Sequence, residues 1–293
     1  MRVRVGFCEA DDRIIQTVKE LEGRNWLELA LITDREFRFL KPKPNSPTAL
    51  SPKALISADQ EDAYLAGLNK LREKEIDILI AGASIALARF LRFVFQTFSS
   101  KRDKSLLFSL APIYWKASER AFSLVDPCVV VNPSPEELAY MAHQAMIITE
   151  ELIDDPIYAC VLAHATAMEN DKMTLHRSTI QRLIERTSPS LVCPHPLQLD
   201  AAMSEEAGRK KLGELPHTPN VLVCPDITSA NLLYKSLEVF SRDSVMLCGA
   251  MLVGLPYGFI GLLPRTVQVG EIVRLVDNLV RVFRSPRLRV SST

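Results

Sequence analysis

Glycine is scarce in this chain, and its scarcity excludes several familiar ways of binding phosphate. Only 11 of the 293 residues are glycine. The sequence contains no G-x-G-x-x-G and no G-x-x-x-x-G-K-[ST] segment, and it also lacks G-x-S-x-G and H-E-x-x-H. A glycine-rich phosphate cradle is therefore not expected. Phosphate would have to be bound by arginine side chains and by the N-termini of helices.

The chain also lacks an excess of charge of either sign. It has 35 Lys and Arg residues against 35 Asp and Glu residues, so we expect no nucleic-acid partner and no general attraction to anionic membranes. The six cysteines include no C-x-x-C pair, and neither Cys nor His clusters at the spacing of a zinc site. Most cysteines lie in apolar, strand-like runs. This indicates buried reduced thiols, no metal and a cytoplasmic protein.

One uncharged stretch, residues 245–263, is about long enough to cross a membrane. It contains Pro256 and four glycines. Because non-helical backbone is not tolerated facing lipid, a strand followed by a Gly/Pro loop explains the stretch better. The N-terminus, MRVRVGF, is too short and too charged for a signal peptide. We therefore expect no association with a membrane.

Apolar runs of strand length alternate with helix-like periodicity along the chain, which predicts a largely parallel sheet with helices on both faces. Pro and Ser followed by two glutamates at 133–137 mark a helix start, and the last helix, 269–283, has a broad apolar face. His164 is expected to be a buried core group rather than a base. The predicted strands are 3–7, 27–32, 77–82, 106–110, 122–131, 158–165 and 220–224.

The most informative stretch is residues 195–235. An apolar strand at 220–224 is stopped by Pro225-Asp226, and a helix follows. In open α/β sheets the carboxyl end of such a strand faces a crevice where ligands bind. Asp226 can serve as the N-cap of the helix or as part of such a site. Asn231 can be a site residue or an ordinary residue of the helix face.

Three segments of this stretch, LQLDAA, NVLVCPD and SANLLYK, have the order and spacing of the phosphate acetyl/butyryltransferase family, which the chain resembles. Weaker similarities extend along most of the chain, in GFCEADDRI, LREKEIDILIAG, FLRFVFQTF, VNPSPEELAYMA and PRTVQVGEIV. The resemblance implies a two-lobed α/β/α sandwich with largely parallel sheets, like isocitrate and isopropylmalate dehydrogenases, and a cleft between the lobes. Lobe one would comprise residues 1–105 completed by the C-terminal helix 268–293, and lobe two residues 106–267.

The chemistry that this resemblance implies is acyl transfer between CoA and inorganic phosphate, giving acyl phosphate and CoA. It makes Arg265, Arg92 and Glu271 the catalytic candidates. The arginines would bind phosphate or CoA oxygens bidentately, and Glu271 would orient or deprotonate the attacking species. No metal or cofactor beyond the CoA ester is implied, and a homodimer is expected. The candidates for binding substrate or CoA are Arg72, Asn231, Asp226, Asp200 and Thr166.

The chain departs from the family at some of these positions. Pro264 stands where the family has a serine, and Glu271 where it has an aspartate. If that serine donates to the oxyanion, its loss costs about 3 kcal/mol, or ~10²-fold in rate. One interpretation is a divergent phosphate acyltransferase. A second is a catalytically impaired relative that binds acyl-CoA or a protein, and a third, a nicotinamide-dependent dehydrogenase, is opposed by the missing Gly-rich turn.

Overall fold

The computed structural model describes residues 2–9, 11–32, 37–39, 60–98, 106–164, 172–187, 192–193, 195–213 and 217–289. The chain forms two compact units. Unit 1 comprises Met1–Ser105 and Cys248–Thr293, and unit 2 comprises Leu106–Leu247. The sequence analysis predicted that the chain returns to unit 1 at residue 268, but it returns at Cys248. The reason is that strand β11 (Phe259–Leu262) pairs with a strand of unit 1, and strand β10 (Ala250–Val253) pairs with β11.

The sheet of unit 1 has the strand order β3-β2-β1-β4-β11-β10. Its central strands β2, β1, β4 and β11 are parallel neighbours, and β3 and β10 are antiparallel to the strands they flank. The central strands are apolar and almost wholly buried, as expected when helices cover both faces. The strands introduced here are β1 (Val3–Phe7), β2 (Leu27–Ile32), β3 (Phe37–Phe39) and β4 (Ile78–Ala81).

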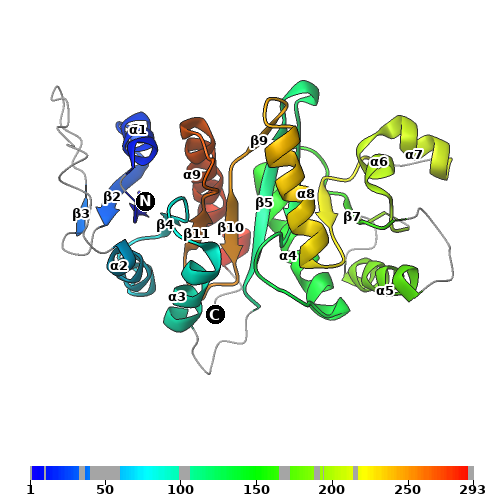
Figure 1. Cartoon of the computed structure of the whole chain (residues 1–293), viewed down its shortest axis with the longest axis horizontal. Helices are drawn as coiled ribbons and strands as arrows, with labels where there is room; N and C mark the ends of the chain where they lie inside the picture. Colours follow the sequence, from blue (N-terminus) through cyan, green and yellow to red (C-terminus); the bar gives the residue numbers. More distant parts are fainter. Residues whose placement is uncertain are drawn as a thin grey trace. The chain divides into compact units, whose positions relative to one another are not determined.

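Two pairs of helices cover this sheet (Figure 1). Helix α1 (Asp12–Leu21) packs on α9 (Val269–Arg284) over one face, and α2 (Gln60–Arg72) packs on α3 (Leu87–Phe98) over the other. The broad apolar face predicted for the last long helix is confirmed, because α9 buries Ile272, Leu275, Val276 and Leu279. A short helix, α10 (Pro286–Arg289), follows.

The sheet of unit 2 has the order β5-β6-β8-β7, and β9 pairs with β5. Strands β6, β8 and β7 are parallel, whereas β5 is antiparallel to both β6 and β9. The predicted strand 122–131 ends earlier, because Asp126 adopts a left-handed φ of 44° and turns the chain. The strands are β5 (Phe108–Trp115), β6 (Arg120–Val125), β7 (Ala159–Val161), β8 (Val221–Val223) and β9 (Val245–Leu247).

The helices of unit 2 lie on both faces of its sheet (Figure 1). Helices α4 and α5 pack together, and α8 lies on the face opposite α4, where it contacts β6 and β9. The predicted helix start at 133–137 is confirmed, because Ser134 and Glu137 form a capping box. The elements are η2 (Lys116–Ser118), α4 (Pro135–Leu152), α5 (Lys172–Thr187), α6 (Leu199–Met203), α7 (Glu205–Leu212) and α8 (Ile227–Phe240).

The uncharged stretch 245–263 is not a helix, as predicted, but it forms three strands, β9, β10 and β11, where one strand and a Gly/Pro loop were expected. In the described ranges of the chain, no helix is both long and apolar enough to cross a membrane. His164 differs from expectation. It is exposed rather than buried, because β7 ends at Val161 and His164 lies beyond it.

Candidate active site

Three candidate residues of unit 1, Arg92, Arg265 and Glu271, lie on segments that follow the carboxyl ends of its parallel strands. Strands β1, β4 and β11 are consecutive parallel neighbours, so their carboxyl ends lie at one edge of the sheet, the edge at which open α/β sheets bind ligands. Glu9 and Arg13 follow β1, and Arg92 lies on the helix that follows β4. Arg265 and Glu271 follow β11.

A buried carboxylate, that of Glu9, holds the turn between β4 and α3. It accepts hydrogen bonds from the backbone N–H groups of residues 82–84, each at 3.0 Å, and from the Tyr64 hydroxyl at 2.6 Å. Gly82 has a φ of +117°, a conformation that residues with a side chain rarely adopt. Glu9 is only 2% exposed, so water does not compete for these bonds. Burial and the nearby Glu9 charge raise the pKa of Tyr64, which keeps its hydroxyl protonated as a donor.

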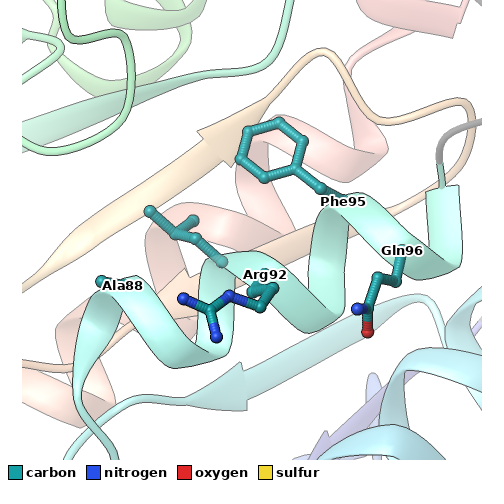
Figure 2. Close-up of a pocket in the computed structure, with 5 residues that line it drawn as sticks. Ala88, Arg92, Phe95 and Gln96 are labelled. Atoms are coloured by element: carbon teal, nitrogen blue, oxygen red, sulfur yellow. The ribbon is translucent and has the colours of Figure 1, made fainter.

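Arg92 is exposed on the second turn of α3. Figure 2 shows Arg92 and Gln96 extending from the same side of the helix, one turn apart, with Phe95 pointing away from them. Together with Ala88 and Leu91 these residues line a shallow groove of about 560 Å³. Within the part of the chain that the structure describes, the guanidinium of Arg92 has no hydrogen-bond or ion-pair partner. It is available to an anion.

Arg13, on α1, holds the loop that carries Arg265. Its Nη1 donates to the carbonyl of Arg265 at 2.6 Å and, at 3.3 Å, to that of Val267. Its Nε and Nη2 donate to Oδ2 of Asp11 at 3.1 and 2.5 Å, and Asp11 is itself the N-cap of α1. The guanidinium of Arg265 is exposed and, among the residues described, unpaired. The loop is thus fixed through its backbone, which leaves the Arg265 side chain free.

Glu271 has a local role in this conformation. It is the third residue of α9, and its carboxylate accepts a hydrogen bond from the backbone N–H of Gln268 at 2.7 Å. The Gln268 side chain accepts in return from the Glu271 N–H, which completes a capping box. To act on a substrate, the carboxylate would have to exchange this bond for one to the substrate. Its catalytic role stays a prediction.

Arg72 does not lie with the other two arginines. Helix α2 ends at Arg72, before β4 begins, whereas Arg92 lies on the helix after β4. The two side chains are therefore carried at opposite ends of β4. The guanidinium of Arg72 lies 4.0 Å from the carboxylate of its neighbour Glu73, which is a long contact, and both side chains are about half exposed. The placement of Arg72 gives no support to the expectation that it assists Arg92.

In unit 2, two candidate residues fix helix α8. Asp226 is the N-cap, and its Oδ1 accepts a hydrogen bond from the Ser229 N–H at 2.8 Å. Asn231 donates through Nδ2 to the carbonyl of Pro127 at 3.0 Å, which ties α8 to the turn after β6. Both side chains are half-buried at the carboxyl edge of parallel strands β6 and β8. The capping role considered for Asp226 is confirmed. A substrate role for either residue stays a prediction.

The structure offers little support for a substrate-binding role of the remaining two candidates, Asp200 and Thr166. Asp200 is exposed and forms an ion pair with Lys211 at 2.7 Å, and the hydrogen bond from Lys211 lowers the pKa of Asp200. Thr166 lies outside the described residues. The role of each in binding substrate stays a prediction.

Asp126, which sequence reasoning missed, is the buried carboxylate of unit 2. It accepts hydrogen bonds from the N–H and hydroxyl of Ser109 and from the N–H groups of Val129 and Val130, at 2.7 to 3.1 Å. Burial raises its pKa against the effect of these bonds. The one signal in the sequence was an aspartate that interrupts an apolar run.

These observations define an α/β protein with exposed arginines at the carboxyl edge of one sheet. No group of three or more His, Cys, Asp or Glu side chains able to hold a metal occurs among the described residues. The family model for phosphate acetyl/butaryl transferase matches residues 52–277. The chain belongs to this family.

Individual relatives agree with this assignment. The phosphate acetyltransferase of Nitrosomonas europaea is 29% identical over 218 residues, which cover 72% of this chain but only 29% of that protein. The phosphate butyryltransferase of Clostridium beijerinckii is 23% identical over 248 residues, which cover 83% of this chain and 81% of that one. The chain therefore spans less than a third of the acetyltransferase and most of the butyryltransferase.

Among solved structures, a branched-chain phosphotransacylase from Enterococcus faecalis V583 matches with a TM-score of 0.72 at 19% identity. The match covers 96% of this chain and 99% of that chain. At this level of identity the likeness shows the fold, and it confirms the predicted α/β/α class.

Proposed function

We propose that this protein is a phosphate acyltransferase, which converts an acyl-CoA and inorganic phosphate into an acyl phosphate and CoA. Family membership supports the reaction class. The observation that carries the proposal for this chain is the pair of exposed guanidiniums, Arg92 and Arg265, after the adjacent parallel strands β4 and β11. Neither has a partner within the described residues.

The unpaired state of these two side chains is informative because other arginines of unit 1 are engaged. Arg4 binds Asp77 at 2.7 Å, Arg13 binds Asp11, and Arg89, on the same helix as Arg92, binds Glu61. A guanidinium keeps its charge at any physiological pH and presents a planar fork that matches phosphate oxygens. Two of them at one sheet edge suit the two anionic substrates of this reaction.

In the proposed reaction a phosphate oxygen attacks the thioester carbonyl carbon. The tetrahedral intermediate then collapses, the carbon–sulfur bond breaks, and CoA leaves as a thiolate that takes up a proton. The arginines would hold the phosphate and the CoA so that attack is effectively intramolecular. Glu271 would leave its helix-capping bond to orient or deprotonate the phosphate. The scheme uses no metal and no cofactor beyond the CoA ester.

The direct test is arsenolysis, in which arsenate replaces phosphate and the loss of the thioester is followed with acetyl-, propionyl- and butyryl-CoA. We expect turnover with at least one ester. Arg92→Ala should lower kcat/KM by about 10- to 10²-fold, because a charge-assisted hydrogen bond is worth about 1.5–3 kcal/mol. Arg89→Ala is the matched control and should leave kcat/KM unchanged. A folded protein that is inactive with all three esters would overturn the proposal and favour an acyl-CoA-binding relative.

Glu271 can be tested separately from its capping role. Glutamine at the third position of a helix preserves a capping box, so Glu271→Gln should leave the free energy of unfolding nearly unchanged. If the carboxylate acts as a general base, kcat should fall by about 10²- to 10⁴-fold. An active Glu271→Gln enzyme would assign the residue to the helix cap alone.

We also propose a cytoplasmic homodimer. The six free cysteines, of which five are buried, support a reducing compartment. Helix α8 leaves Leu232, Val239 and Phe240 exposed by 62%, 69% and 85%, which supports a protein contact on this face. Light scattering should give twice the chain mass for the wild type. A monomeric mass at working concentration would refute the dimer, and Phe240→Asp tests whether α8 forms the contact.

A further inference from the structure

We propose that Glu9 and Arg13, which both follow β1, are positioning residues for the two anion-binding arginines. Glu9 fixes the turn before the helix of Arg92, and Arg13 fixes the loop of Arg265. One short piece of chain after β1 thus contacts both arginine-bearing segments. This inference rests on the proposed function, because it treats Arg92 and Arg265 as the groups that bind substrate.

The contacts of Glu9 define the direction in which α3 leaves the sheet. Three consecutive N–H groups, of residues 82–84, converge on one carboxylate, so the turn cannot rotate without breaking several bonds together. A fourth donor, the Tyr64 hydroxyl, comes from α2 and joins the two helices of this face to the end of β1. Arg92 lies less than two turns beyond the start of α3 at Leu87. A tilt at the turn would therefore displace its guanidinium.

The contacts of Arg13 act on Arg265 in the same way. Two nitrogens of the Arg13 fork bind Oδ2 of Asp11, and the third donates to the Arg265 carbonyl. Asp11 is itself fixed as the N-cap of α1, where its Oδ1 accepts from the Ile14 N–H at 3.0 Å. The chain of contacts therefore runs from a helix cap to the backbone of Arg265. A lysine at position 13 lacks the planar fork that makes both sets of bonds.

A second buried carboxylate offers an internal comparison. Asp77, 1% exposed, accepts four hydrogen bonds, as Glu9 does: three from the backbone and side chain of Arg4, at 2.7 to 3.1 Å, and one from the Tyr257 hydroxyl at 2.5 Å. It lies just before β4, at the opposite end of the strand from the turn that Glu9 holds. Its loss should therefore lower stability without moving the arginines.

The experiment compares Glu9→Gln, Arg13→Lys and the control Asp77→Asn in the full chain. Three quantities are measured: CoA binding by calorimetry, kcat and KM in arsenolysis, and the thermal midpoint. We expect Glu9→Gln and Arg13→Lys to weaken CoA binding and to lower kcat/KM by about 10- to 10²-fold, the effect of misplacing a binding group by about 1 Å. Asp77→Asn should change CoA affinity and kcat/KM by no more than about twofold, although it should lower the thermal midpoint at least as much as Glu9→Gln and Arg13→Lys do.

The outcomes separate the two proposals. An active wild type with Glu9→Gln and Arg13→Lys indistinguishable from Asp77→Asn would overturn the positioning role alone. A wild type that neither binds CoA nor turns over would overturn the proposed function, and the positioning role with it. Should Glu9→Gln not accumulate as folded protein, Tyr64→Phe removes one of the four donors. It should then lower kcat/KM by about threefold, the effect of weakening a network rather than removing it, and wild-type kinetics would count against the positioning role.

Discussion

Replacing Pro264 by serine tests whether the departure from the family pattern limits the reaction. Pro264 lies directly before Arg265, and its carbonyl accepts a hydrogen bond from the Val267 N–H at 3.1 Å. A substitution preserves this carbonyl, and proline has no N–H to lose. Serine adds two donors, a hydroxyl and a backbone N–H, in a half-buried position beside one of the proposed anion-binding groups. The substitution therefore adds two hydrogen-bond donors without removing a contact of the loop.

Two effects of unequal size are expected. Losing the proline restriction on the unfolded chain should lower the free energy of unfolding by about 0.4–1 kcal/mol. A hydroxyl aimed at the tetrahedral oxyanion should lower the barrier by about 3 kcal/mol, which raises kcat by ~10²-fold. The gain in rate exceeds the loss in stability, so a slightly less stable and faster enzyme is expected.

The assay is arsenolysis at saturating acyl-CoA, with urea unfolding measured on the same preparations. Pro264→Ala is the matched control, because it introduces the backbone N–H and removes the ring but adds no hydroxyl. We expect kcat to rise for Pro264→Ser well above the value for Pro264→Ala. Equal kcat values for the two variants, with both proteins folded, would refute the reasoning that a hydroxyl at this position stabilises the transition state.

Three further predictions concern stability. Burial raises the pKa of Asp77, but the hydrogen bonds from Arg4 and Tyr257 outweigh it, so the net pKa is lowered. The stabilisation is therefore present above the unfolded pKa of about 4 and is lost as pH falls through the folded pKa. Urea unfolding between pH 2 and 7 should show a shallower acid loss for Asp77→Asn, and an acid limb as steep as that of the wild type would contradict this. Gly82→Ala should destabilise by about 1–3 kcal/mol, because φ is +117° and the new Cβ would lie 3.1 Å from the backbone N and O of Leu263. Chemical denaturation measures this, and a neutral result would refute the strain. Leu279→Ala, at a fully buried position of α9, should cost about 2–5 kcal/mol, whereas the exposed neighbour Arg281→Ala should change the unfolding free energy by less than about 0.5 kcal/mol.

Much of the local structure could be predicted from the sequence. The alternation of strands and helices, the helix start at Ser134 and the capping position of Asp226 all follow from residues within a few positions of one another. The stretch 245–263 could be assigned to a strand and a loop rather than to a membrane helix because its proline and glycines oppose a helix. The boundary at Cys248 was missed because it depends on which strand β11 pairs with, and pairing partners far apart in sequence leave no local signal.

The candidate site, too, could be predicted from the sequence only in part. Arg92 and Arg265 were identified from motifs, and the fold places both after adjacent parallel strands. Arg72 was identified in the same way, yet it is carried at the other end of β4. A motif records which residue types occur at a given spacing. It does not record to which edge of a sheet the following helix delivers them.

The family, the α/β class and the two arginines that carry the proposed chemistry could all be predicted from the sequence, because each is encoded in short segments read in order. The contacts that hold those arginines in place could not be predicted in this way. Glu9 meets the turn 73 to 75 residues further along the chain, and Arg13 meets Arg265 across 252 residues. Such contacts exist only once the sheet has brought β1, β4 and β11 side by side, since hydrogen bonds of this range follow from strand order and not from any local pattern.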